Sequence, residues 1–224
     1  MKAYALLLIM ALALLPVVGA LATPSTLIWI PSTDIQANGT WHLGIDSYFT
    51  ARNTKQATVY DIGPEYGFAG GRAEAGIDYI SPNDSPLFFN VKYLLTREKG
   101  SVPALAVGLQ NWGTQTGVTD FDMAYLLGSK TLGPARLTLG YCHGKRSTLG
   151  RAPDMLLAGV DGYFDQAKKW WGAVDYQSGK NAFGALSAGG AYSFAPNVSV
   201  IFGYDWMQAP GLKDTITTQL DINF

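Results

Sequence analysis

The chain has 224 residues, of which 48% are hydrophobic and only 15% charged, and its net charge is −1. The balanced charge, with no basic run, makes nucleic acid an unsuitable partner. A single cysteine and two histidines exclude an intramolecular disulfide framework and a cysteine-rich zinc site, so we expect no metal and no cofactor. Length and composition, with 26 glycines and 28 aromatic residues (12 Tyr, 10 Phe and 6 Trp), fit one all-β domain.

The first 22 residues have the pattern of a signal peptide. Lys2 precedes an apolar run from Ala3 to Leu15, and Ala20-Leu21-Ala22 is the small-residue pattern of a cleavage site. We expect cleavage before Thr23, with cleavage after Ala20 or an uncleaved membrane anchor as alternatives. Beyond residue 22 no apolar stretch reaches the ~18 residues of a transmembrane helix.

Residues 23–40 are predicted to be irregular, because they contain two prolines and one glycine and show no regular period. The apolar run at 27–30 has two possible positions. It lies either at the periplasmic membrane interface or inside the lumen of the following domain as a plug.

From residue 41 onward the sequence alternates apolar and polar residues, which is the period of β-strands. Trp41, Leu43 and Ile45, for example, share one face, while His42 and Asp46 share the other. The pattern predicts twelve strands, at residues 41–50, 57–68, 71–80, 87–96, 103–111, 121–129, 135–142, 155–163, 170–178, 183–194, 198–207 and 215–224. Turn signals such as Gly133-Pro134 separate them, and no helical period occurs outside the signal peptide.

Strands of about 9–11 residues are long enough to cross a bilayer when tilted. Together with export and an even strand number, they favour an all-β fold: a transmembrane antiparallel up-and-down β-barrel of about 12 strands over residues 41–224. Its apolar faces meet lipid; for 121–129 that face is the set Phe121, Met123, Tyr125 and Leu127. Aromatic residues near strand ends suit interfacial girdles: Trp41, Tyr79, Phe121, Tyr141, Trp170, Tyr176, Phe194 and Trp206. A soluble exported β-protein is the alternative, because it shares the same period.

The last predicted strand alternates apolar residues and ends in Phe224. This strand resembles the C-terminal signal of small bacterial outer-membrane β-barrel proteins, and the signal peptide fits the same export route. Residues 24–36 also look like the start of uncharacterised barrels of this kind. The resemblance implies location in the outer membrane of a Gram-negative bacterium. It also implies contact with lipid and recognition by the barrel-assembly machinery during biogenesis.

An even strand number places both termini on the periplasmic side. The loops are too short to constrict a trimeric porin from within, so we expect a monomer. Polar-face charges then point into the lumen, with most aspartates in its outer half and the basic residues at mid-height or nearer the periplasm. The candidate lumen residues are Asp46, Asp61, Asp78, Asp122, Asp175, Asp205, Arg72, Glu74, Lys92 and Arg136. In this arrangement Glu74 lies beside Arg72.

Three functions fit this arrangement. The first is a passive channel for small solutes, whose acidic outer vestibule concentrates cations. The second is a structural or envelope-interaction barrel whose lumen is closed by mutually neutralised charges or by residues 23–40. The third is a barrel-embedded lipid hydrolase, which needs His42 or His143 within reach of a hydroxyl group. Neither histidine lies in a hydrolase motif, so we expect no enzyme.

Overall fold

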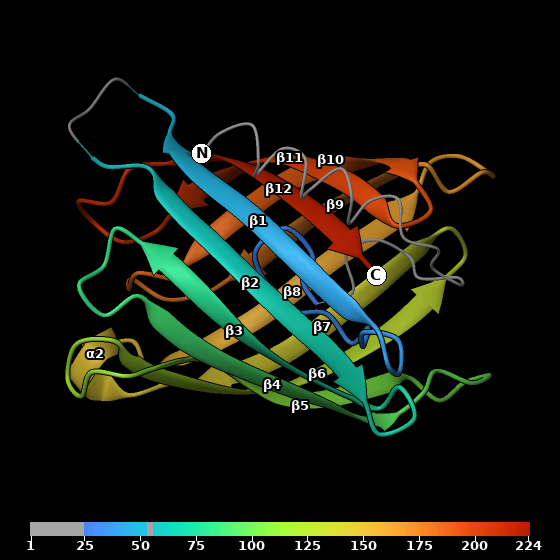
Figure 1. The fold of residues 1–224 in the computed structure, drawn as a ribbon, viewed down its shortest axis with the longest axis horizontal. Coiled ribbons are helices and arrows are strands. Elements are labelled where there is room, and N and C mark those ends of the chain that lie inside the picture. Colours follow the sequence, from blue (N-terminus) through green and yellow to red (C-terminus); the bar gives the residue numbers. More distant parts are fainter. Residues whose placement is uncertain (1–24, 53–55) are drawn as a thin grey trace.

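The computed structural model describes residues 25–52 and 56–224, and the predicted signal peptide lies outside these ranges. The described part is a closed antiparallel barrel in which each strand pairs with its sequence neighbours and β1 pairs with β12. Figure 1 shows the strongly tilted strands around one axis. The strands are β1 (Trp41–Thr50), β2 (Val59–Phe68), β3 (Ala73–Ser81), β4 (Leu87–Thr96), β5 (Ala104–Gly113), β6 (Asp120–Leu132), β7 (Ala135–His143), β8 (Asp154–Tyr163), β9 (Trp170–Gln177), β10 (Ala185–Ala195), β11 (Val198–Met207) and β12 (Thr215–Asn223).

The predicted fold class and strand number are confirmed. Three strands, 41–50, 87–96 and 198–207, have the predicted bounds, and the others differ by a few residues. One short helix, α2 (Arg146–Leu149), lies in the β7–β8 loop, where the sequence showed no helical period. Four residues form a single turn, too short to show a period. Within the described ranges no helix combines the length and apolar character needed to cross a membrane.

The two ends of the barrel differ. Short turns join β2–β3, β4–β5, β6–β7, β8–β9 and β10–β11 at one end, which we call the turn end. There, the tight β6–β7 turn is built on Gly133, whose φ of 63° is readily adopted only by glycine. The other six connections lie at the opposite end, which we call the loop end.

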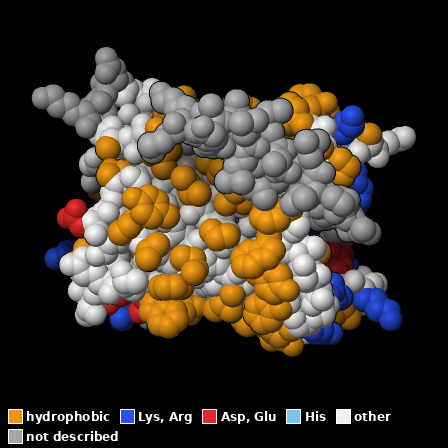
Figure 2. Space-filling view, viewed as in Figure 1, with side chains coloured by type: hydrophobic (Ala, Val, Ile, Leu, Met, Phe, Trp, Pro, Cys, Tyr) orange, Lys and Arg blue, Asp and Glu red, His pale blue; other side chains and the backbone are white. Residues whose placement is uncertain are grey.

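The outer surface is apolar, because the outward residue of each alternating pair is aliphatic or aromatic. Leu139, for example, is 67% exposed and Phe202 is 62% exposed. Figure 2 shows apolar side chains across the middle of the visible face, with charged side chains mainly towards its two ends. Seven of the eight predicted girdle aromatics are exposed: Trp41, Tyr79, Tyr141, Trp170, Tyr176, Phe194 and Trp206.

The predicted facing of β6 is wrong. Met123, Tyr125 and Leu127 are buried inside the barrel, whereas Leu126 is 51% exposed on the outside. Phe121, the eighth predicted girdle residue, packs edge-on against Phe183 in the inner cluster. The other alternating set of this strand also contains apolar residues, namely Ala124, Leu126 and Leu132, so the period alone did not fix which set faces inward.

Barrel closure joins the first strand to the last. Trp41 N donates to Phe224 O at 2.7 Å, and Phe224 N donates to Trp41 O at 2.8 Å. These bonds continue the β1–β12 ladder to the turn end, so the barrel has no unpaired edge, as a sheet in lipid requires.

Candidate functional site

The lumen wall formed by β1 to β4 carries carboxylates above glycines. Asp46 lies opposite Asp61 in the β1–β2 register, and the side chain of Asp78 lies directly over Gly63. Glu65 covers Gly76 in the same way, since a Cβ added there would be 2.5 Å from Glu65 Cγ. The missing side chains at these glycines leave space for the neighbouring acids, so this wall concentrates negative charge without filling the lumen.

A buried ion pair crosses this wall. Lys92 Nζ lies 2.8 Å from Glu74 Oε1, and both side chains are 3% exposed. The β3–β4 register places Glu74 directly opposite Lys92. The expected neighbour of Glu74, Arg72, instead lies exposed in the β2–β3 turn, where its guanidinium approaches the carbonyl oxygens of Leu94 and Leu95.

The carboxylate wall continues around the barrel closure. His42 Nε2 lies 3.5 Å from Asp221 Oδ1, and His42 Nδ1 lies 3.3 Å from Asn223 Oδ1. Because β1 pairs with β12, these residues from opposite ends of the chain come together inside the lumen.

A cavity of about 480 Å³ opens beside this wall and extends to the loop end, where Asn83 and Lys213 contribute to its lining. Aromatic side chains, among them Trp29 and Tyr48 in edge-to-face contact, form its other sides. Its charged lining comprises six carboxylates and two lysines, together with His42: Asp46, Asp61, Glu65, Glu74, Asp78, Asp221, Lys92 and Lys213.

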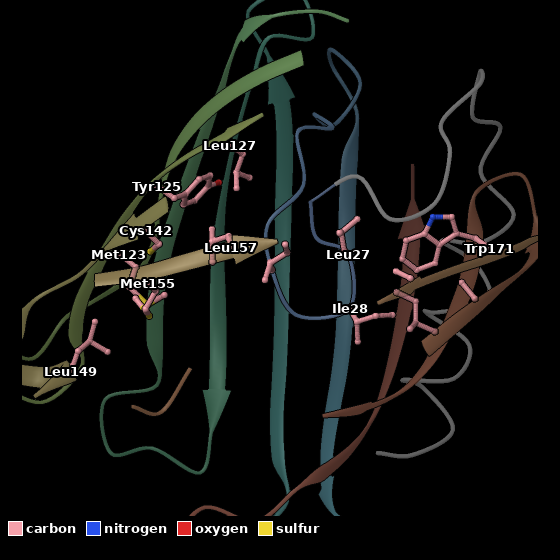
Figure 3. Packing of buried hydrophobic residues seen from close by; sticks show 14 residues of the cluster. Leu27, Ile28, Met123, Tyr125, Leu127, Cys142, Leu149, Met155, Leu157 and Trp171 are labelled. Carbon is pink, nitrogen blue, oxygen red and sulfur yellow. The ribbon is translucent and has the colours of Figure 1, made fainter. Parts of the chain in front are cut away.

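Residues 25–37, which we call the plug, lie inside the barrel. A hairpin-like turn closes with Leu27 N donating to Ile30 O at 2.9 Å. The side chains of Leu27, Ile28 and Ile30 are at most 1% exposed. These side chains pack against the inward residues of β6 to β11, and Figure 3 shows Leu27 and Ile28 within that cluster. The barrel-side members are Met123, Tyr125, Leu127, Cys142, Met155, Leu157, Trp171, Ala173, Ala191 and Ile201.

Burying each of these aliphatic side chains contributes about 1.5–3 kcal/mol. The plug is also held by polar contacts. Asp175 Oδ2 accepts hydrogen bonds from Ile28 N at 2.7 Å and Trp29 N at 3.0 Å, while Gln219 Nε2 donates to Ile28 O at 2.8 Å. Of the two positions that the sequence left open for 27–30, the structure has the one inside the lumen.

On the other side of the plug, a second cavity of about 870 Å³ lies at the turn end. Its charges are mixed, with Arg97, Arg136 and Lys168 among four acidic residues. Arg136 bridges the plug and the wall, because its Nη1 donates to Asp34 at 2.6 and 2.7 Å and its Nε donates to Asp161 at 3.0 Å.

Three further predicted lumen residues lie away from the acidic cavity. Asp175 is occupied with the plug backbone, and Asp205 is fully buried, accepting from Thr215 Oγ1 at 2.8 Å. Asp122 lies at the loop end of β6, 2.7 Å from Lys145 Nζ. The sequence therefore grouped side chains that belong to separate local sites, and the reversed facing of β6 removes the reason for placing Asp122 in the lumen.

Neither histidine has the geometry of a hydrolytic base. The His42 side chain lies against Asp221 and Asn223, and His143 Nδ1 lies 2.8 Å from Asp154 Oδ1 on the exposed side. The buried hydroxyl groups of Ser129 on β6 and Thr138 on β7 bond each other at 2.7 Å. Among residues 25–52 and 56–224, no three acidic, histidine or cysteine side chains converge as metal ligands.

Two charged groups in the connections have displaced pKa values. Hydrogen bonds from Lys130 and Thr131 lower the pKa of Glu98 in the β4–β5 turn below its ordinary value. In the β7–β8 loop, hydrogen bonds to Asp120 and then Asp122 raise the pKa of Lys145. Each contact ties a connection to one end of β6 at a barrel rim.

A family model described as exopolysaccharide biosynthesis protein YbjH matches residues 87–206, which is more than half of the chain. The chain belongs to the YjbH family. No curated protein matches this YjbH-family chain. The match spans β4 to most of β11, and so includes Lys92, Arg136 and Asp175 but not the plug or the β1–β3 carboxylates.

Solved porin structures share the fold. The KdgM porin is 11% identical, with 82% of this chain and 98% of that chain covered at a TM-score of 0.57. A KdgM porin in complex with disordered oligogalacturonate is 12% identical, covering 83% and 99%, at 0.52. The NanC porin is 10% identical, covering 81% and 98%, at 0.51. At these identities the similarity concerns architecture: the YjbH-family chain is a porin-like barrel.

Sequence reasoning missed Glu65 and Asp221 as members of the acidic cavity, and Asp34 as the plug's ion-pair partner. Glu65 and Asp221 share the inward face with Asp61 and Gln219, so the alternation itself contained the signal. Asp34 carried no such signal, because it belongs to a segment without a period.

Proposed function

We propose that this YjbH-family chain is an outer-membrane channel for small solutes, with an acidic vestibule that prefers cationic or neutral solutes and performs no catalysis. The observation that carries the proposal is the loop-end cavity: six carboxylates against two lysines, in the lumen of a closed barrel with an apolar exterior. Rings of acidic side chains concentrate cations in channels, and low-dielectric walls strengthen that field.

The proposed orientation puts the turn end, with residues 38–40 and Phe224, on the periplasmic side and the loop end outside. Short turns lie on the periplasmic side of bacterial barrels, whereas the longer connections are external. Lipid covers the apolar exterior, the assembly machinery recognises the strand ending at Phe224, and the barrel acts as a monomer.

The family description and the charge of the vestibule together narrow the solute. Membership of a family described by exopolysaccharide biosynthesis favours a saccharide. A polyanion such as the oligogalacturonate of the KdgM complex would be repelled by this carboxylate wall. We therefore propose neutral or amine-bearing saccharide fragments, which avoid that repulsion.

The test is ion selectivity in planar bilayers under a tenfold KCl gradient. We expect the protein lacking residues 25–37, whose lumen is unobstructed, to show a reversal potential whose sign indicates cation selectivity. It should move towards zero in the same protein carrying Asp46→Asn, Asp61→Asn and Asp78→Asn. The matched control is Asp205→Asn, an inward carboxylate outside the cavity lining, which should leave the potential unchanged. A folded protein lacking 25–37 that passes no current contradicts the channel, and anion selectivity contradicts the acidic vestibule.

A barrel with a permanently closed lumen is the second candidate, and the buried plug favours it. In that case residues 25–37 belong to the core, and their removal exposes an apolar wall to water and lowers stability without creating a selective pathway.

A further inference from the structure

We propose that the plug is a gate that swings out of the lumen on residues 38–40 and joins the two cavities into one pathway. This inference rests on the proposed channel function and adds its regulation. It concerns residues 25–37 and the lumen wall against which they lie.

The plug is the partition between the cavities. Thr26 lines both of them. The plug contributes Trp29 and Pro31 to the loop-end cavity, and Asp34 and Gln36 to the turn-end cavity. Displacement of this segment therefore connects about 480 Å³ at one end with about 870 Å³ at the other.

The barrel does not depend on the plug for its hydrogen-bonded ladder. Twelve strands close on themselves through β1 and β12. Among described residues, the backbone-to-backbone bonds of 25–37 stay within residues 25–40, as in Ser32 N to Ser25 O at 2.9 Å. The first such bonds to a strand come after the plug, where Gly39 N donates to Gly67 O and Gly67 N donates to Thr40 O. The plug can thus leave without breaking a strand pair.

Besides the apolar packing of Leu27, Ile28 and Ile30, polar contacts hold the plug to the wall, and most of these polar contacts involve charged groups that water or a solute can also satisfy. Glu74 Oε2 accepts from Gln36 N at 2.6 Å, Lys92 Nζ donates to Ser25 O at 3.1 Å, and Arg136 binds Asp34. Charge-assisted bonds of this kind are strong in a closed lumen and exchange readily for hydration once water enters.

A hinge lies between the plug and β1. Gly39 has a φ of 78°, and a Cβ added to it would meet nothing within 4 Å. Open space and glycine's access to both signs of φ let the backbone turn here, as hinge positions do. Asn38 Oδ1 accepts from Gly70 N at 2.8 Å, which holds one side of the hinge on the turn-end rim.

The wall is shaped to the plug at a few glycines. A Cβ added at Gly203 would lie 3.0 Å from Ile28 Cγ2, and one added at Gly189 would lie 3.0 Å from Ile28 Cδ1. At Gly159 the corresponding distance is 2.5 Å, to Leu27 Cδ1. Glycine at these points gives the closed state a defined position, which a gate needs as its resting state.

The experiment is a reversible disulfide between plug and wall. Ile28→Cys puts a sulfur near the site of Cγ2, within 3.0 Å of the Cβ that Gly203→Cys supplies, and this suits a disulfide. Both changes are made in the full chain with Cys142→Ala, so that the native thiol cannot compete. Current is recorded in a planar bilayer before and after dithiothreitol is added to the same membrane.

We expect no channel openings while the disulfide is intact, and at least a tenfold rise in mean current after reduction. Ile28→Cys and Gly203→Cys alone, each with Cys142→Ala, should not respond to dithiothreitol. A cross-linked protein, verified by mass spectrometry, that conducts as well as the reduced one overturns the gate. So does a reduced protein that stays silent while the protein lacking 25–37 conducts, because the plug is then fixed. Silence of the folded deletion protein overturns the channel itself, and the gate with it.

Discussion

The two walls of the lumen differ in whether their inward residues leave a cavity or pack against the plug. On β1 to β3, glycines alternate with carboxylates such as Asp61 and Asp78, and a cavity remains beside them. On β6 to β11, inward residues such as Met155 and Leu157 meet the plug in a continuous apolar cluster. The outward faces of both halves are alike. Inward side chains alone therefore make one half of the barrel a vestibule and the other half a core.

Truncating a plug side chain that packs against the apolar wall should have the largest effect on the free energy of unfolding. Leu27→Ala removes a fully buried side chain from the plug, and such truncations cost about 2–5 kcal/mol. We expect the free energy of unfolding to fall by that amount in urea titrations of the refolded barrel. Ser25→Ala, which lies on the carboxylate side of the same plug, should cost less. Equal losses of stability at Leu27 and Ser25 would show that the apolar and carboxylate walls hold the plug equally strongly.

Replacing an aspartate by asparagine should lower stability on the apolar wall and raise it on the carboxylate wall. Asp175→Asn weakens the charge-assisted acceptor of Ile28 N and Trp29 N, and we expect a loss of about 1.5–3 kcal/mol. Asp61→Asn relieves the like-charge contact with Asp46 directly opposite, and we expect a gain of about 0.2–1 kcal/mol. Denaturation midpoints at neutral pH and low salt measure both, and a loss at Asp61 would contradict the proposed excess of negative charge.

The third change adds volume and should lower stability less than truncation of Leu27 does. Gly203→Ala places a methyl group 2.9 Å from Thr217 Cγ2 and 3.0 Å from Ile28 Cγ2, which requires Thr217 and the plug to shift, and overpacking costs about 1–3 kcal/mol. Gly44→Ala is the matched control, because its Cβ would meet nothing closer than 3.5 Å, at His42 Nε2. Thermal melts of the two variants, read by loss of barrel heat-modifiability, should separate them by several degrees. Identical melts would show that the apolar wall is not closely fitted to the plug.

The sequence was sufficient for the barrel, because a period of two identifies strands whether lipid or water meets one face. It failed at β6, where Met123 and Leu126 are equally apolar and only the packing of the lumen decides between them. The alternation placed Glu74 beside Arg72 because the two residues have the same phase. However, β3 begins at Ala73, so Arg72 lies in the preceding turn and Lys92 lies opposite Glu74. The plug's position was left open because contacts such as Asp34 with Arg136 join residues 102 apart.

The bond from Gln219 to Ile28 has a consequence for biogenesis. The plug precedes the first strand, yet part of its binding site is on the last. A nascent or truncated chain that stops before Thr215 would lack both the strand that closes the ladder and the amide that holds the plug. Closure of the barrel and completion of the plug's binding site therefore both depend on β12, although the other plug contacts lie on earlier strands.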